Sequence, residues 1–167
     1  MRPYGATFPS PGRSGPCPGR ASANCEVSEP IKCFFLEPTD RADAEGPSLF
    51  RRADTGEEMT LAAAPVGAMW FADWYPPSSW RGPDGHVLVV RCPHDHDWIV
   101  DGRCSNCTRK DDSTHRCWVR HGAPPDVTVD KSGDTCSAGA GSLGVWNADR
   151  TAYAWHGFLR GGYLIEC

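Results

Sequence analysis

The residues best suited to metal chemistry are concentrated in residues 92–107, which read CPHDHDWIVDGRCSNC. Three cysteines and two histidines fall in this stretch, around an Asp-Gly pair that is typical of a tight turn. Zinc prefers four tetrahedral ligands drawn from cysteine sulfur and histidine nitrogen. Cys104 and Cys107 have the two-residue spacing of a turn that carries two ligands. The stretch therefore predicts a zinc site.

A second ligand pair lies on the other side of the Asp-Gly turn. Cys92 begins a Cys-Pro turn, and either His94 or His96 follows at a distance that suits a second ligand. The arrangement resembles a zinc ribbon or zinc knuckle with one histidine ligand, although the linker is shorter than in most ribbons. The expected ribbon-like set is Cys92, His96, Cys104 and Cys107.

A competing group of possible ligands follows in the chain. In the sequence HRCWVRH, strand alternation would place His115, Cys117 and His121 on one face, and Cys136 comes shortly after. A mixed set is equally well formed by spacing, and it consists of Cys104, Cys107, Cys117 and His121. The sequence leaves the choice among these sets open.

The same residues also allow interpretations without a metal. Cys136 precedes a small, glycine-rich segment, residues 135–144, whose backbone N–H groups could hold an anion beside a nucleophilic thiol. His121 or His156 would then act as the base, although a plain tight turn is the simpler interpretation of the segment. Cysteines beside aromatic residues, such as Cys33 and Cys117, also suit a hydrophobic core.

Composition limits the classes of protein that the chain can belong to. It has 167 residues, nine cysteines and a net charge of −4. The acidic balance argues against nucleic-acid binding unless the fold segregates the basic residues between 103 and 120. No apolar run is long enough for a membrane span, and the N-terminus lacks the apolar region of a secretory signal. We therefore expect reduced thiols rather than disulfides.

The elements that position these residues are predicted to be short strands. Residues 1–29 are rich in Pro, Gly and Ser and predict a flexible arm, and residues 30–167 predict a single domain that contains the Cys/His cluster of residues 92–136. Strands are expected in IKCFFLEP, GHVLVVRC, DWIV, HRCWVRH and VTVD, with a terminal hairpin across Gly161 and Gly162. A short helix near residues 55–63 is only weakly indicated. The fold class is mostly β or α+β.

Across residues 66–160 the chain resembles small uncharacterised proteins encoded in tailed bacteriophage and prophage genomes. The segments that carry the resemblance are GAMWFADW, DGRCSNCT, HRCWVRHGAPPDVTVDK, TCSAGAGS and WHGFLR. The resemblance implies no activity, but it implies expression inside a bacterial host. It also implies that Cys92 and Cys104 need not be shared by the family, which leaves the later group, namely Cys107, His115, Cys117, His121 and Cys136.

Three functions are consistent with these observations. We expect foremost a small phage-type protein with a structural zinc site that binds a host or phage macromolecule, a protein rather than a nucleic acid. One alternative is a thiol-dependent or metal-dependent hydrolase that uses the Cys/His cluster. The other is a virion component whose aromatic stretch from Trp70 to Trp80 forms an interface. The expected location is the bacterial cytoplasm or the virion.

Overall fold

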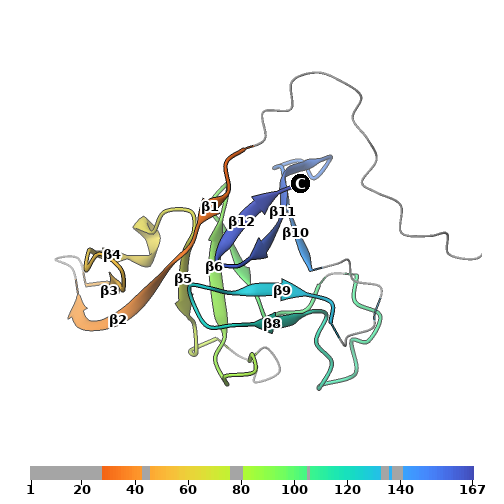
Figure 1. Ribbon diagram of the computed structural model, residues 1–167, viewed down its shortest axis with the longest axis horizontal. Helices are drawn as coiled ribbons and strands as arrows, with labels where there is room; N and C mark the ends of the chain where they lie inside the picture. The colour runs from red at the N-terminus through yellow and green to blue at the C-terminus, as the bar shows by residue number, and fades with distance from the viewer. Residues whose placement is uncertain (1–27, 43–45, 76–80, 105, 133–135, 137–140) are drawn as a thin grey trace, which may run out of the picture.

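The computed structural model describes residues 28–42, 46–75, 81–104, 106–132, 136 and 141–167. Within these ranges the chain forms short strands and one 3-10 turn (Figure 1). The elements are β1 (Ile31–Lys32), β2 (Phe34–Ala42), β3 (Ser48–Arg52), β4 (Glu58–Thr60), η1 (Leu61–Ala63), β5 (Ala68–Phe71), β6 (Leu88–Cys92), β7 (His96–Ile99), β8 (Val119–His121), β9 (Thr128–Asp130), β10 (Ser142–Trp146), β11 (Tyr153–Arg160) and β12 (Tyr163–Glu166).

The larger sheet has the strand order β4-β3-β2-β5-β6-β7. Its β2–β5 pair is parallel, and the other pairs are antiparallel. Every residue of β6 is buried, as its run of Leu and Val predicts for a central strand. The tight turn from β6 to β7 places His94 and Asp95 at positive φ and aligns Cys92 with His96 across the hairpin.

A second sheet has the order β1-β12-β11-β10, and β8 pairs with β9 alone. β11 and β12 form the predicted hairpin, with Gly161 and Gly162 at positive φ in its turn. β1 pairs with β12, so strands from opposite ends of the described chain lie side by side (Figure 1). The β10–β11 pair is interrupted by a register shift next to Val145 and Trp146.

Two hydrophobic clusters hold the sheets together. The smaller one packs strands of the larger sheet and their connections together, and it includes Leu36, Trp70 and Val87. The larger one joins β5, β6 and β7 to the second and third sheets, and it includes Trp98, Leu159 and several cysteines. The cysteines therefore occupy the region where the three sheets meet.

The β-rich fold class is confirmed, because the described chain has almost no helix. The weakly indicated helix near residues 55–63 is instead β4 followed by the 3-10 turn, since Met59 pairs with Phe50 of β3. The aromatic stretch is divided: Trp70 is 3% exposed and belongs to the core, whereas Trp74 is 62% exposed. Most of the predicted N-terminal arm, residues 1–27, lies outside the described residues.

The described part of the chain contains no helix with the length and apolar character needed to cross a lipid bilayer.

Candidate metal centre

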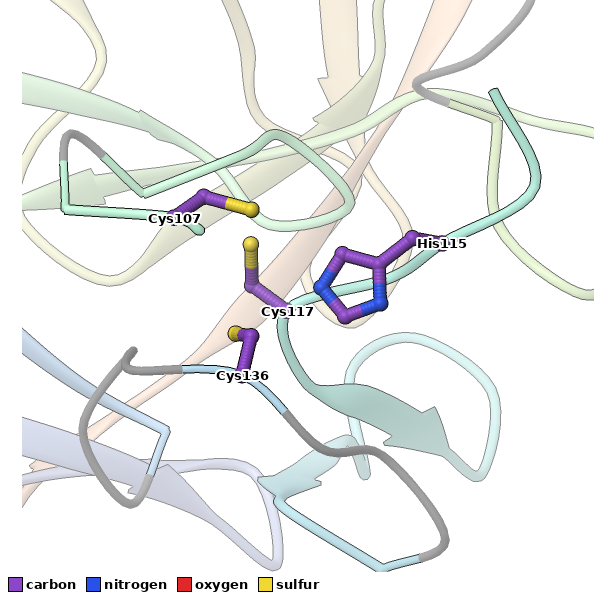
Figure 2. Close-up of side chains that lie close together, drawn as sticks. All are labelled: Cys107, His115, Cys117 and Cys136. Carbon is purple, nitrogen blue, oxygen red and sulfur yellow. The ribbon is translucent and has the colours of Figure 1, made fainter. Parts of the chain in front are cut away.

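Four possible metal ligands converge in the described structure. The ligand atoms of Cys107, His115, Cys117 and Cys136 all lie within 4.8 Å of one another. Figure 2 shows the thiols of Cys107 and Cys117 pointing toward each other, with the imidazole of His115 and the thiol of Cys136 beside them. Three of the four residues are buried, and Cys136 is half-buried. Among the described residues, this is the one group of three or more such side chains that could hold an ion.

A network of polar contacts shapes the loop that presents Cys107. The Arg103 guanidinium donates to the carbonyl oxygens of Arg109 and Lys110 at 2.6 and 2.8 Å, and also to the carbonyl of Asp112. The N–H of Cys107 donates to the Cys104 carbonyl at 3.2 Å, which closes the tight turn expected between these two cysteines. The loop is thus folded around its own backbone rather than by strand pairing.

A second turn presents His115 and Cys117. The Asp112 carboxylate accepts hydrogen bonds from the N–H groups of Thr114 and His115, at 3.0 and 3.2 Å. Trp118, next to Cys117, donates its indole N–H to the Val100 carbonyl. These contacts anchor both ends of the turn, so the imidazole and the thiol face the same point. Cys136 reaches this point from the segment between β9 and β10.

The surroundings of the cluster shift the pKa values of two of its thiols in opposite directions, and zinc binds the thiolate form of cysteine. Burial on its own would raise the pKa of the Cys107 thiol, but hydrogen bonds from the Arg109 N–H and from the neighbouring thiols, with the charge of Arg103, lower it overall. The Lys131 ammonium lies 3.6 Å from the Cys136 Sγ. Burial raises the pKa of Cys117. The positive charges of Lys131 and Arg103 therefore lie close to two of the three thiols, those of Cys136 and Cys107.

Cys104 is a further thiol at the edge of the cluster. Its Sγ lies 3.4 Å from the Cys117 Sγ, and its N–H donates to the same sulfur at 3.5 Å. It does not belong to the group of four whose ligand atoms all lie within 4.8 Å of one another. Cys104 therefore contacts a candidate ligand without completing the four-residue group.

The structure does not bring the ribbon-like set of Cys92, His96, Cys104 and Cys107 together. The Cys92 side chain is fully buried in the core, where burial raises the pKa of its thiol. His96 is exposed on the neighbouring strand. The physical reason is that the Cys-Pro segment forms a hairpin turn between β6 and β7 instead of a ligand turn.

The expected histidine–thiol row on one strand face is also absent. β8 begins only at Val119, so His115 and Cys117 precede the strand and lie in irregular chain. His121 is exposed, and its imidazole Nε2 lies 3.1 Å from the Asp130 carboxylate. Of the later group, His121 alone does not belong to the cluster, and the mixed set containing it does not form either.

A groove of about 910 Å³ borders the cluster, and sequence reasoning did not find it. It is lined by Cys104, by Trp98 and Trp118, and by side chains of the β10–β11 pair. Trp146 and Tyr153 line it as exposed aromatic residues, 51% and 53% exposed, and their ring centroids are 4.2 Å apart. No local pattern could have revealed this groove, because its walls come from segments that are distant in sequence.

The basic residues between 103 and 120 do not form an open cationic patch. Arg120 has no exposed side-chain surface and binds Asp84 and Asp101, at 2.7 and 3.1 Å. Arg109 forms an ion pair with Asp112, and the Arg103 guanidinium donates hydrogen bonds to backbone carbonyls. The fold therefore uses much of this charge in contacts within the chain.

No protein-family model, curated protein or solved structure matches this chain. The functional conclusion therefore rests on the side chains and their geometry.

Proposed function

We propose that this chain is a small phage-type binding module that holds one structural zinc ion through Cys107, His115, Cys117 and Cys136. The observation that carries the proposal is the convergence of these four ligand atoms within 4.8 Å. In a tetrahedral zinc site with bonds of about 2.0–2.3 Å, neighbouring ligand atoms lie roughly 3.3–3.8 Å apart. A contraction of about 1 Å would therefore bring the four side chains into zinc geometry.

The chemistry of the four donors favours zinc over other ions. Thiolate and imidazole ligands in a tetrahedral arrangement suit Zn²⁺, whereas Mg²⁺ and Ca²⁺ prefer oxygen ligands. Three thiolates and one neutral imidazole around Zn²⁺ would leave one net negative charge. Lys131 beside Cys136 and Arg103 beside Cys107 are placed to offset that charge.

The position of the cluster favours a structural role for the ion. Between β7 and β8, none of the described residues belongs to a strand or helix. Loops of this length are uncommon in small domains unless something ties them together. Four protein ligands fill a tetrahedral site, so none of the four positions remains open for a water or substrate. A metal-dependent hydrolase is therefore the weaker proposal.

The binding role rests on the groove beside the cluster. Exposed aromatic side chains that line a concave surface are typical of recognition sites, and Trp146 with Tyr153 provides such a surface. We propose that zinc fixes one wall of this groove through the loop that carries Cys104 and Cys107. The bound macromolecule would be a host or phage protein in the bacterial cytoplasm or the virion.

Metal content per chain tests the proposal when it is measured by elemental mass spectrometry on protein purified without chelator. About one zinc ion per chain is expected, and Cys107→Ser should lose it. Cys104→Ser is the matched control, because it removes a neighbouring thiol outside the group of four. This control should retain the ion.

Two results would overturn the proposal. Absence of metal from the wild-type protein would remove the zinc site altogether. Retention of full zinc in Cys107→Ser would show that other residues bind the ion.

A further inference from the structure

A second group of side chains, separate from the metal cluster, has the arrangement of an activated thiol. The Cys167 Sγ lies 2.9 Å from the His156 Nδ1, and the His156 Nε2 lies 3.1 Å from the Ser142 Oγ. We propose that these residues form a nucleophilic thiol site that accepts acyl groups from esters and thioesters. In this site Cys167 is the nucleophile, His156 the base, and Ser142 the residue that positions the imidazole.

The strands hold the thiol and the imidazole together. The Cys167 N–H donates to the His156 carbonyl at 3.0 Å, which extends the pairing of β12 with β11. On the other side of β11, His156 is paired with Gly144 of β10. A nucleophile, a base and a third group that orients the base are thus supplied by three adjacent backbone segments.

Ring stacking fixes the plane of the imidazole. Tyr153 stacks on His156 with a centroid distance of 5.3 Å and an interplanar angle of 18°. Strict alternation along β11 would place residues 153 and 156 on opposite faces. The register shift that pairs Val145 with Trp155 and Trp146 with Tyr153 adds one residue between them, so the two rings share a face.

Two of the three residues of the site line the groove, and Cys167 lies next to its His156 wall, outside the lining. Ser142 and His156 both line it, together with Trp146 and Tyr153. Cys167 is the one exposed cysteine among those that the structure describes. An ester or thioester could therefore reach the exposed thiol from solvent, with an apolar part of its acyl group directed across His156 toward the aromatic side chains. The favoured substrates are acyl groups that carry a planar or apolar moiety.

The acyl transfer balances without any redox partner. The His156 Nδ1 takes the thiol proton as the Cys167 sulfur attacks the carbonyl carbon. A carbon–sulfur bond forms, and the bond to the alcohol or thiol leaving group breaks; the leaving group takes the proton from His156. Water then attacks the acyl-thioester, passes a proton to His156 and releases the carboxylic acid, and the thiol is restored.

The test uses the full-length chain and p-nitrophenyl acetate. We expect a burst of p-nitrophenolate together with an acetyl group on Cys167, located by peptide mass spectrometry. General-base assistance is typically worth 10²–10⁴-fold, so acetylation at neutral pH should exceed that of N-acetylcysteine by at least about 10-fold. Cys167→Ser should abolish the burst. Cys25→Ser, which removes a cysteine outside the described residues, should leave it unchanged.

Two further variants separate base catalysis from a merely structural effect. His156→Gln can still reach Ser142 with its amide but lacks a nitrogen at the Nδ1 position, so its rate should fall to that of N-acetylcysteine. Ser142→Ala should slow acetylation and Ser142→Thr should restore it, because the hydroxyl is what positions the imidazole. Circular dichroism and a cooperative thermal unfolding transition show whether each variant is folded.

Two outcomes contradict the proposal. One is acetylation of Cys167 no faster than that of N-acetylcysteine in the folded wild-type protein. The other is a His156→Gln variant that is folded and as fast as wild type. Neither depends on the zinc site, because both compare acetylation rates in samples whose folding is checked without reference to metal.

Discussion

At the scale of single residues, the ion pair of Arg120 is the most deeply buried charge contact described. The guanidinium has no exposed surface and contacts Asp101, whose side chain is 5% exposed, and Asp84, which is 35% exposed. Burial raises the pKa of Asp101, while the Arg120 charge and hydrogen bond act in the opposite direction. Arg120 thus allows a buried carboxylate to exist between β7 and β8.

Arg120→Met should destabilise the fold by about 3–5 kcal/mol at neutral pH, since it leaves the Asp101 charge without its partner. In the variant the folded state should bind the Asp101 proton more tightly than the unfolded state does. The free energy of unfolding should therefore fall as pH rises from 5 to 8. Urea unfolding at several pH values measures both effects.

The control for this prediction is a second change at the other end of the pair. Asp101→Asn in the Arg120→Met background removes the buried charge and should recover part of the lost stability and most of the pH dependence. If the single variant is as stable as wild type at pH 8, the ion pair does not have this role.

An exposed carboxylate provides a prediction for acid pH. Hydrogen bonds from Ser132, followed by the contact with His121, lower the pKa of Asp130 to about 2. A carboxyl whose pKa is lower in the folded state stabilises the fold above its unfolded pKa of about 4, and that contribution disappears as pH falls through about 2. Asp130→Asn should therefore flatten the decline in stability between pH 4 and 2. A decline as steep as that of wild type, in thermal unfolding curves, would refute this.

The sequence alone predicted all four residues of the Cys/His cluster as candidate ligands, but it did not predict which candidates lie together in the fold. Cys107, His115, Cys117 and Cys136 were all candidates, but so were Cys92 and His96 at equally good spacing. What separates them is the side of the backbone on which each falls. Pairing of β6 with β7 turns Cys92 into the core, and that pairing depends on long-range contacts that spacing does not encode.

At the scale of elements, the turn that joins β8 to β9 is more constrained than its sequence indicates. Gly122 has φ of +80°, and a Cβ there would lie 2.3 Å from the Asp126 carbonyl oxygen. Gly85 has nearly the same φ, +82°, but a Cβ there would meet nothing within 4 Å. A comparison of substitutions at the two glycines therefore distinguishes the cost of backbone strain from the cost of a steric clash.

Gly122→Ala should therefore cost more stability than Gly85→Ala. Left-handed backbone at a non-glycine residue costs roughly 1–2 kcal/mol, and both variants pay it. The clash with the Asp126 carbonyl adds to this cost only at Gly122, because the backbone of the turn must move. Chemical denaturation of the two variants measures the difference. Equal losses would show that the turn relaxes freely.

The regular elements were largely predictable from sequence, and the irregular ones were not. The β-branched run in GHVLVVRC and the Gly-Gly turn before Tyr163 mark β6 and the β11–β12 hairpin correctly. The loop between β7 and β8 has no such period. Its shape depends on the Arg103 and Asp112 side chains, which bond to backbone groups several residues away.

At the scale of the whole molecule, the Cys/His cluster lies where the three sheets meet. Cys107 and Cys117 belong to the same hydrophobic cluster as Trp98 of β7, Val129 of β9 and Leu159 of β11. Because a ligand that binds only the folded state stabilises it, zinc bound at this position would stabilise the contacts among all three sheets. The loop and the groove wall would depend on it most.

Removal of zinc should therefore lower the thermal midpoint of the whole domain. A chelator in excess should shift the unfolding midpoint down, and added zinc should restore it. Cys107→Ser should unfold at the lower temperature with or without chelator. Calorimetry with and without chelator measures this, and an unchanged wild-type midpoint after verified loss of zinc would contradict a structural role for the ion.

X-ray absorption at the zinc edge tests the identity of the four proposed ligands most directly. The proposed site predicts three sulfur neighbours at about 2.3 Å and one nitrogen neighbour at about 2.0–2.1 Å. The spectrum of Cys104→Ser should be the same. A first shell of four sulfurs that loses one in Cys104→Ser would place Cys104 in the site instead of His115. A shell of oxygen and nitrogen alone would contradict the site altogether.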